Sequence, residues 1–175
     1  KSYLAAHTIL INLWVFSFFF IDGFSNAGNA ISGKLLGKKD FKALTLLSKD
    51  LVKYNLIVAS VLALIFLALY PFLGRIFSND TEVVSHFYSV FWLIILAQFV
   101  SGVTFTYDGV FKGLGETAYL RNTLIFATLF LFVPVIYLLD IVDLKLYAIW
   151  IAFLLWNMFR GGSLIYKFRK KYYTV

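Results

Sequence analysis

Long apolar runs, separated by short polar stretches, follow one another along the whole chain. A helix of about 20 apolar residues crosses the roughly 30 Å hydrocarbon core of a bilayer, and five runs reach that length. The pattern predicts an all-α, polytopic transmembrane bundle with spans near residues 4–33, 44–70, 83–111, 119–139 and 146–167. No Ser/Gly-rich or low-complexity linker divides the sequence, so a single bundle is expected.

The composition excludes a water-soluble domain. Of the 175 residues, 61% are hydrophobic and only 14% are charged, whereas soluble domains carry about 25% charged residues. The chain contains no cysteine, which excludes disulfides, thiolate metal sites and cysteine nucleophiles. We expect no metal site and no catalytic residue.

The basic residues alternate between the two sides of the predicted spans. One side carries thirteen of them: Lys34, Lys38, Lys39, Lys42, Lys49, Lys53, Lys112, Arg121, Arg160, Lys167, Arg169, Lys170 and Lys171. The other side has only Lys1, Arg75 and Lys145. A Lys/Arg excess marks the cytoplasmic side, so the C-terminus is predicted to be cytoplasmic. Membrane lipids are expected partners of these dispersed charges, and nucleic acid is not.

Several residues are predicted to begin, end or bend helices. Asp40, Asp80 (or Asn79) and Thr117 are expected to cap the second, third and fourth helices. Pro71 is expected to follow the second span, and Pro134 to kink the fourth.

Two stripes of polar residues run along the first and third spans. Asp22, Asn26, Asn29 and Gly33 share one helical face of the first span. Gln98, Ser101, Thr104 and Asp108 form the stripe of the third. A charge at mid-bilayer costs about 2.5–3.5 kcal/mol, so both stripes are predicted to face the interior.

The stripes have two interpretations. They line a cavity for a substrate or a coupling ion, or they hold helices together through hydrogen bonds. Helix contacts are favoured for Asn26 and Asn29, and both interpretations stay open for Asp22. Asp108 is expected to be structural, paired with Lys112 one turn away.

Two glycine patterns mark the cytoplasmic ends of these spans. Gly33 and Gly37 stand four apart, as do Gly109 and Gly113, and each pair is followed by an acidic residue. Small residues at this spacing allow helix backbones to approach closely. All four glycines are predicted helix-packing residues.

The remaining candidate chemistry favours the membrane interface over catalysis. His7 and His86 lie near the outer ends of spans without further ligands at metal-binding spacing. Interface anchoring is favoured over ligand stacking for the four tryptophans, which are Trp14, Trp92, Trp150 and Trp156. Tyr107–Asp108 and the nearby glycines resemble motifs of intramembrane aspartyl proteases. Those enzymes need two aspartates on separate helices, so an enzyme is not expected.

Three segments, IDGFSNAGNAISGKLLGKKD, FSNDTEV and FTYDGVFKGLGETAYLRN, together resemble the multidrug and toxin extrusion (MATE) transporters. The segment AAHTILINL also fits, and the similarity is strongest to helices eight to twelve of the DinF-like branch. The resemblance implies that residues 1–175 are a C-terminal lobe fragment, whose partner is an N-terminal lobe absent from this chain. It implies export of amphipathic or cationic small molecules by alternating access, coupled to H⁺ or Na⁺ without another cofactor. A bacterial cell (inner) membrane is the implied location.

Two positions depart from that family. Ser101 stands where sodium-coupled NorM-like members carry an acid, and Asn29 where many DinF-like sequences are expected to carry a glutamate. Neither residue titrates, which weakens an ion site in this half. The alternatives are a lipid-precursor flippase of the same superfamily, which would need Arg or Lys at membrane depth, and a non-transporting membrane scaffold.

Overall fold

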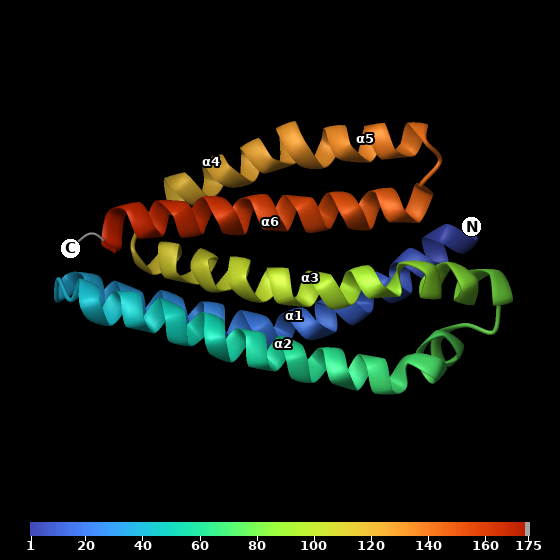
Figure 1. The fold of residues 1–175 in the computed structure, drawn as a ribbon, viewed down its shortest axis with the longest axis horizontal. Helices are drawn as coiled ribbons and strands as arrows, with labels where there is room; N and C mark the ends of the chain where they lie inside the picture. The colour runs from blue at the N-terminus through green and yellow to red at the C-terminus, as the bar shows by residue number, and fades with distance from the viewer. Residues whose placement is uncertain (174–175) are drawn as a thin grey trace.

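The computed structural model describes residues 1–173, and they form the predicted all-α, five-span bundle (Figure 1). The long helices are α1 (Ser2–Gly37), α2 (Phe41–Phe77), α3 (Thr81–Gly113) and α6 (Lys145–Tyr172). The fourth span is one rod made of α4 (Thr117–Ala127), a π-helical turn η1 (Thr128–Phe132) and α5 (Val133–Ile141). Each helix extends beyond its predicted ends, by as many as seven residues at the C-terminal end of α2.

The helices form a layered bundle with α3 at its centre (Figure 1). α1 and α2 lie on one side of α3, and the contact between α1 and α3 is the most extensive. α6 packs on the other side of α3, and the rod of α4, η1 and α5 packs mainly on α6. The connections alternate between the two ends of the bundle, so the loops with the lysine-rich segments share the end that also holds the C-terminus.

The predicted helix starts are right at two positions and wrong at a third. Asp40 accepts a hydrogen bond from the Ala43 backbone N–H at 2.9 Å, and Asp80 accepts one from that of Glu82 at 2.9 Å. Thr117 is not the cap, because it is already the first residue of α4. Its neighbour Glu116 stands at the cap position, and its side chain makes no capping hydrogen bond to the helix backbone.

Both prolines lie within helical rods. The prediction for Pro71 is wrong, because α2 continues through it to Phe77. The Tyr88 hydroxyl donates to the Tyr70 carbonyl at 2.8 Å and accepts from the Gly74 N–H at 3.2 Å, so it bridges the opened helical hydrogen bond. Pro134 lies in the first turn of α5, directly after η1. A π turn is a common way to accommodate a local distortion.

The core consists of two apolar clusters at different depths. One lies toward the N-terminal end of α1 and includes Leu10, Phe87 and Trp150. The other lies toward the opposite end and includes Leu44, Phe111 and Phe168. Between them, buried polar side chains cross the bundle. We call this set the polar layer; it comprises Ser17, Asn55, Gln98, Ser101, Thr104, Thr106, Asp108, Asn157 and Arg160.

Candidate functional site

Glycines bring the backbones of α1 and α3 into direct contact. A methyl group at Gly109 would overlap the carbonyl of Ser25, and one at Gly113 would overlap that of Asn29. A methyl group at Gly33 would lie 3.1 Å from the Gly113 carbonyl oxygen. The prediction that Gly37 packs in the same way is wrong, because this residue faces open space at the end of the helix.

The stripe on α3 lies in helix contacts. Gln98 donates from Nε2 to the Ser17 hydroxyl on α1 at 3.1 Å. Thr104 donates to the Asn157 carbonyl of α6 at 3.0 Å. Ser101 is buried beside them, and its hydroxyl has no partner among the described residues. These three residues therefore occupy helix interfaces and do not line any of the described pockets.

Asn55 of α2 completes the polar layer, and the sequence analysis missed it. Its side chain is fully buried and donates from Nδ2 to the Gly102 carbonyl at 3.1 Å and to the Thr106 hydroxyl at 3.0 Å. It also lies 3.3 Å from the Ile21 carbonyl of α1. This one amide thus connects α2 to both α1 and α3. The sequence feature that could have identified Asn55 is an asparagine within an apolar stretch.

A buried ion pair joins α3 to α6. Arg160 Nη2 lies 2.5 Å from Asp108 Oδ2, and both residues are almost inaccessible to solvent. The Arg160 guanidinium also stacks over the Trp156 ring, 4.4 Å from its centroid. Two expectations are corrected here. Asp108 pairs with Arg160 rather than Lys112, and Arg160 lies near the middle of α6 rather than at the cytoplasmic end.

Sequence reasoning missed this pair because the partners are distant along the chain. The available signal was WNMFRGG, in which an arginine follows an apolar run and precedes two glycines. Gly161 lies against Thr104, where a methyl group would come 2.6 Å from the threonine hydroxyl. The close approach of α6 to α3 brings the guanidinium within reach of the carboxylate.

The polar face of α1 is largely uncovered by the described helices. Asn26 donates from Nδ2 to Asp22 Oδ2 at 3.0 Å. Asp22 is half-buried, whereas Asn26 and Asn29 are exposed. The prediction that these two asparagines face the interior and make helix contacts is therefore wrong among the described residues. This face therefore presents a carboxylate and two amides between the ends of a membrane-spanning helix. Such groups can bind a proton, a metal cation or an organic ammonium group.

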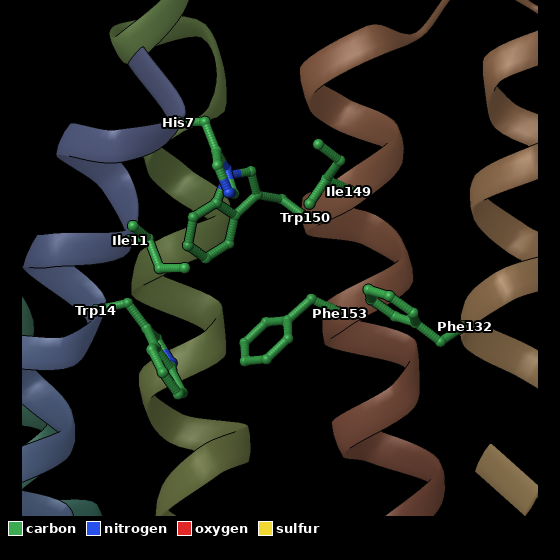
Figure 2. A pocket seen from close by; sticks show the side chains of 7 residues that line it. All are labelled: His7, Ile11, Trp14, Phe132, Ile149, Trp150 and Phe153. Carbon is green, nitrogen blue, oxygen red and sulfur yellow. The ribbon is translucent and has the colours of Figure 1, made fainter. Parts of the chain in front are cut away.

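An aromatic pocket lies between α1, η1 and α6 (Figure 2). It has a volume of about 210 Å³ and is lined by His7, Ile11, Trp14, Phe132, Ile149, Trp150 and Phe153. We call it the outer pocket. Trp150 and His7 were expected at the interface, but Trp150 is only 3% exposed. Among the described residues, Trp150 Nε1 and His7 Nδ1 have no hydrogen-bond partner.

The other tryptophans differ in their surroundings. Trp92 is exposed on α3, as expected of a residue that faces lipid. Trp156 is partly buried and donates from Nε1 to the Thr128 hydroxyl at 3.1 Å. Since Thr128 begins η1, this bond ties α6 to the π-helical turn.

Comparison with known proteins gives two kinds of match. The sequence profile of the family described as MatE matches residues 1–138. Protein DETOXIFICATION 42 of Arabidopsis thaliana is 28% identical over 123 residues, which cover 70% of this chain and 24% of that protein. Protein DETOXIFICATION 45, chloroplastic, of the same plant is 22% identical over 116 residues, which cover 66% of this chain and 21% of that protein. The chain thus spans about a quarter of the length of these curated relatives.

Proposed function

The chain belongs to the MatE family, and we propose that it is part of a transporter exporting amphipathic, often cationic compounds in exchange for H⁺ or Na⁺. In this proposal, residues 1–175 are the C-terminal lobe of a DinF-like protein, equivalent to helices eight to twelve. The N-terminal lobe, membrane lipids and the exported compounds are its partners.

The observation that carries the proposal is the uncovered polar face of α1. Asp22 and Asn26 are bonded to each other between the ends of a membrane-spanning helix, and the described helices do not enclose them. An acid at this depth in contact with lipid is costly. A wet cavity between two lobes removes that cost, and alternating access requires such a cavity.

The proposed mechanism assigns different roles to the two polar stripes. Asp22 is the candidate for binding the coupling ion or the ammonium group of a substrate, with Asn26 orienting its carboxylate. Asp108 is neutralised by Arg160, so we assign it to the rigid body of the lobe. Ion and substrate prefer different states of the cavity, and their differential affinities drive the exchange.

The test is transport by the full-length protein in proteoliposomes under an imposed H⁺ or Na⁺ gradient. A fluorescent organic cation is loaded, and its gradient-driven movement is followed. We expect Asp22→Asn to abolish coupled transport while the protein remains folded. Asp50→Asn is the matched control, because Asp50 is exposed near the start of α2. Normal coupled transport by Asp22→Asn would refute the role of Asp22.

A flippase for lipid precursors is less well supported. It would need free basic groups at membrane depth to hold a pyrophosphate. Arg160 lies at such a depth, contrary to our expectation that no basic residue would, but its charge is already paired with Asp108. Neither a flippase nor a scaffold without transport activity predicts gradient-driven movement of the organic cation by the wild-type protein, so the same assay separates the proposed exporter from both alternatives.

A further inference from the structure

A positively charged pocket lies between α4 and α6, at the end of the bundle that holds the C-terminus of α6. It has a volume of about 460 Å³ and is lined by Tyr119, Tyr166, Lys167, Lys170 and Lys171. We call it the basic pocket. Among the described residues that line it, three carry a positive charge and none carries a negative one. The basic pocket therefore favours an anion.

The charged groups of the basic pocket are accessible to a ligand. Lys170 and Lys171 are exposed, and Lys167 is half-buried. The Lys167 ammonium group lies over the Tyr119 ring, 5.2 Å from the ring centroid. The Tyr119 hydroxyl is bonded to Ser163 Oγ of α6 at 2.7 Å, which holds this ring between α4 and α6. An anion can thus reach the lysines without any rearrangement of the helices.

One carboxylate lies beside the basic pocket. Glu116, which directly precedes α4, accepts hydrogen bonds from Lys171 and from the Tyr172 hydroxyl. This contact offsets part of the positive charge. A single carboxylate beside three ammonium groups still leaves the lining positive.

The surface next to the basic pocket, toward the middle of the spans, is apolar. Phe126 lies seven residues after Tyr119 on α4, and Phe159 lies seven residues before Tyr166 on α6. Seven residues span two helical turns, or roughly 10 Å along the axis. The two phenylalanine rings stack with their centroids 5.6 Å apart, and they are 50% and 37% exposed. A ligand in the basic pocket therefore has an apolar surface beside it.

An anionic group joined to a hydrocarbon chain fits both features. Lysine ammonium groups bind phosphate oxygens as point charges, and tyrosine rings are enriched at the level of lipid head groups. Basic pockets between membrane helices bind the head groups of anionic lipids in other membrane proteins. A soluble phosphate would contact the same lysines but would gain nothing from the apolar surface of Phe126 and Phe159.

We propose that the basic pocket binds the phosphate group of an anionic phospholipid, with an acyl chain of that lipid along Phe126 and Phe159. The inference goes beyond the proposed export function, because it assigns a defined lipid site on the outside of the lobe. It does not depend on transport.

Lysines near a membrane surface also attract anionic lipids without forming a site. That attraction is similar for every lysine close to the surface, so the position of a substitution separates the two cases. Lys38 and Lys39 lie in the turn between α1 and α2, at the same end of the bundle, and are exposed outside the basic pocket. They offer a matched control with the same loss of charge.

The test titrates the purified full-length protein in detergent with dioleoylphosphatidylglycerol and resolves the bound lipids by native mass spectrometry. Dioleoylphosphatidylcholine, whose choline cancels the phosphate charge, is the comparison. We expect the wild-type protein to bind phosphatidylglycerol about fivefold more tightly, since the head group then carries a net negative charge.

The variant Lys167→Gln/Lys170→Gln removes two of the three charges and leaves the bond between Lys171 and Glu116 in place. We expect its affinity for phosphatidylglycerol to fall about tenfold. The control Lys38→Gln/Lys39→Gln should stay within about twofold of wild type. All four lysines lie outside the two apolar clusters, so thermal unfolding in lipid-free detergent should be unchanged in both variants.

An unchanged affinity in Lys167→Gln/Lys170→Gln would overturn the proposal. Equal weakening in both double variants would also overturn it, and would indicate attraction by dispersed charge. Glycerol 3-phosphate, added as a competitor, should displace the lipid only weakly, and competition as strong as that of the lipid itself would overturn the assignment to a phospholipid. Because no ion gradient is applied, a failure here leaves the transport proposal untouched, and a failure of transport leaves the binding result in place.

Discussion

The polar layer and the outer pocket both place polar groups inside an apolar bundle, yet they use them differently. In the polar layer, Gln98, Asn55 and Arg160 each donate to a neighbouring helix. In the outer pocket, the donor of Trp150 is buried beside a hollow and is unpaired among the described residues. The difference teaches that burial alone does not mark a binding site. An unpaired atom alone does not mark one either, because the Ser101 hydroxyl and the Gln98 Oε1 of the polar layer also have no partner among the described residues.

The largest effect on stability is expected from disrupting the ion pair of the polar layer. Arg160→Met leaves the Asp108 carboxylate buried without its partner, and removing one member of a buried pair costs about 3–5 kcal/mol. We expect a loss of this size in the free energy of unfolding, measured by SDS titration in mixed micelles. Arg121→Met is the control, because the Arg121 side chain is exposed on α4.

A second substitution sharpens the result. Adding Asp108→Leu to Arg160→Met removes the unpaired charge as well, and replacing both charges of such a pair by apolar groups is often nearly neutral. The double variant should therefore recover most of the lost stability. A double variant as unstable as Arg160→Met alone would show that the cost arises from packing around Trp156 rather than from the charge.

The contact between α1 and α3 should give the next largest effect. Gly109→Ala places a methyl group against the Ser25 backbone, which cannot move as a flexible side chain can. Overpacking of this kind costs about 1–3 kcal/mol. The expected readout is a lower free energy of unfolding in the same SDS titration.

Gly37→Ala is the matched control for Gly109→Ala. Both change a helical glycine on α1 or α3, but Gly37 faces open space. Its effect should stay within about 0.5 kcal/mol, as for most surface substitutions. Equal destabilisation by the two variants would contradict a specific backbone contact at Gly109.

Asn55 should contribute less than the glycine contact. Asn55→Leu removes the donor that serves the Gly102 carbonyl and the Thr106 hydroxyl. Interhelical hydrogen bonds in membranes are worth about 0.6 kcal/mol on average. Losing the two bonds of Asn55 should therefore lower the free energy of unfolding by about 1 kcal/mol. Asn29→Leu, with an exposed side chain, should change stability less, and the reverse order would contradict the assignment of Asn55.

The architecture could be predicted from the sequence because it follows from one-dimensional features. Apolar runs of sufficient length define the spans, and Asp40 and Asp80 mark two helix starts through bonds to residues only two or three positions away. The glycine spacing likewise pointed to α3 as a packing helix, since Gly109 and Gly113 lie on one face.

The pairing of side chains could not be predicted in the same way. Asp108 has a lysine one turn away in the sequence, yet its partner is an arginine 52 positions further on. Choosing between them requires the crossing of α3 and α6, which small residues such as Gly161 and Thr104 determine. The surroundings of Trp150 could not be predicted either, because only the three-dimensional arrangement of α1, η1 and α6 decides whether its indole faces lipid or a pocket.

The smallest expected effect is at the end of the bundle that holds the C-terminus of α6, where Glu116 contacts α6 from outside the spans. Its carboxylate accepts hydrogen bonds from Lys171 and from the Tyr172 hydroxyl, the latter at 3.2 Å. Burial alone would raise the pKa of Glu116, but the hydrogen bond and charge of Lys171 outweigh burial and hold the pKa below its ordinary value of 4.5. A lowered folded-state pKa gives stability that is complete above the unfolded value and is lost as the pH falls through the folded one.

Glu116→Gln should therefore be less stable than wild type at pH 7, by no more than about 1 kcal/mol because Lys171 is half-exposed. The difference should shrink as the pH is lowered below 4.5, since wild-type Glu116 then becomes protonated and loses its charge. Thermal unfolding in detergent between neutral and acidic pH measures both quantities, and Asp50→Asn controls for the loss of an exposed acid. A difference that grew on acidification would mean that Glu116 is held in its neutral form, and the contact between the α3–α4 loop and α6 would then depend on Tyr172 rather than on Lys171.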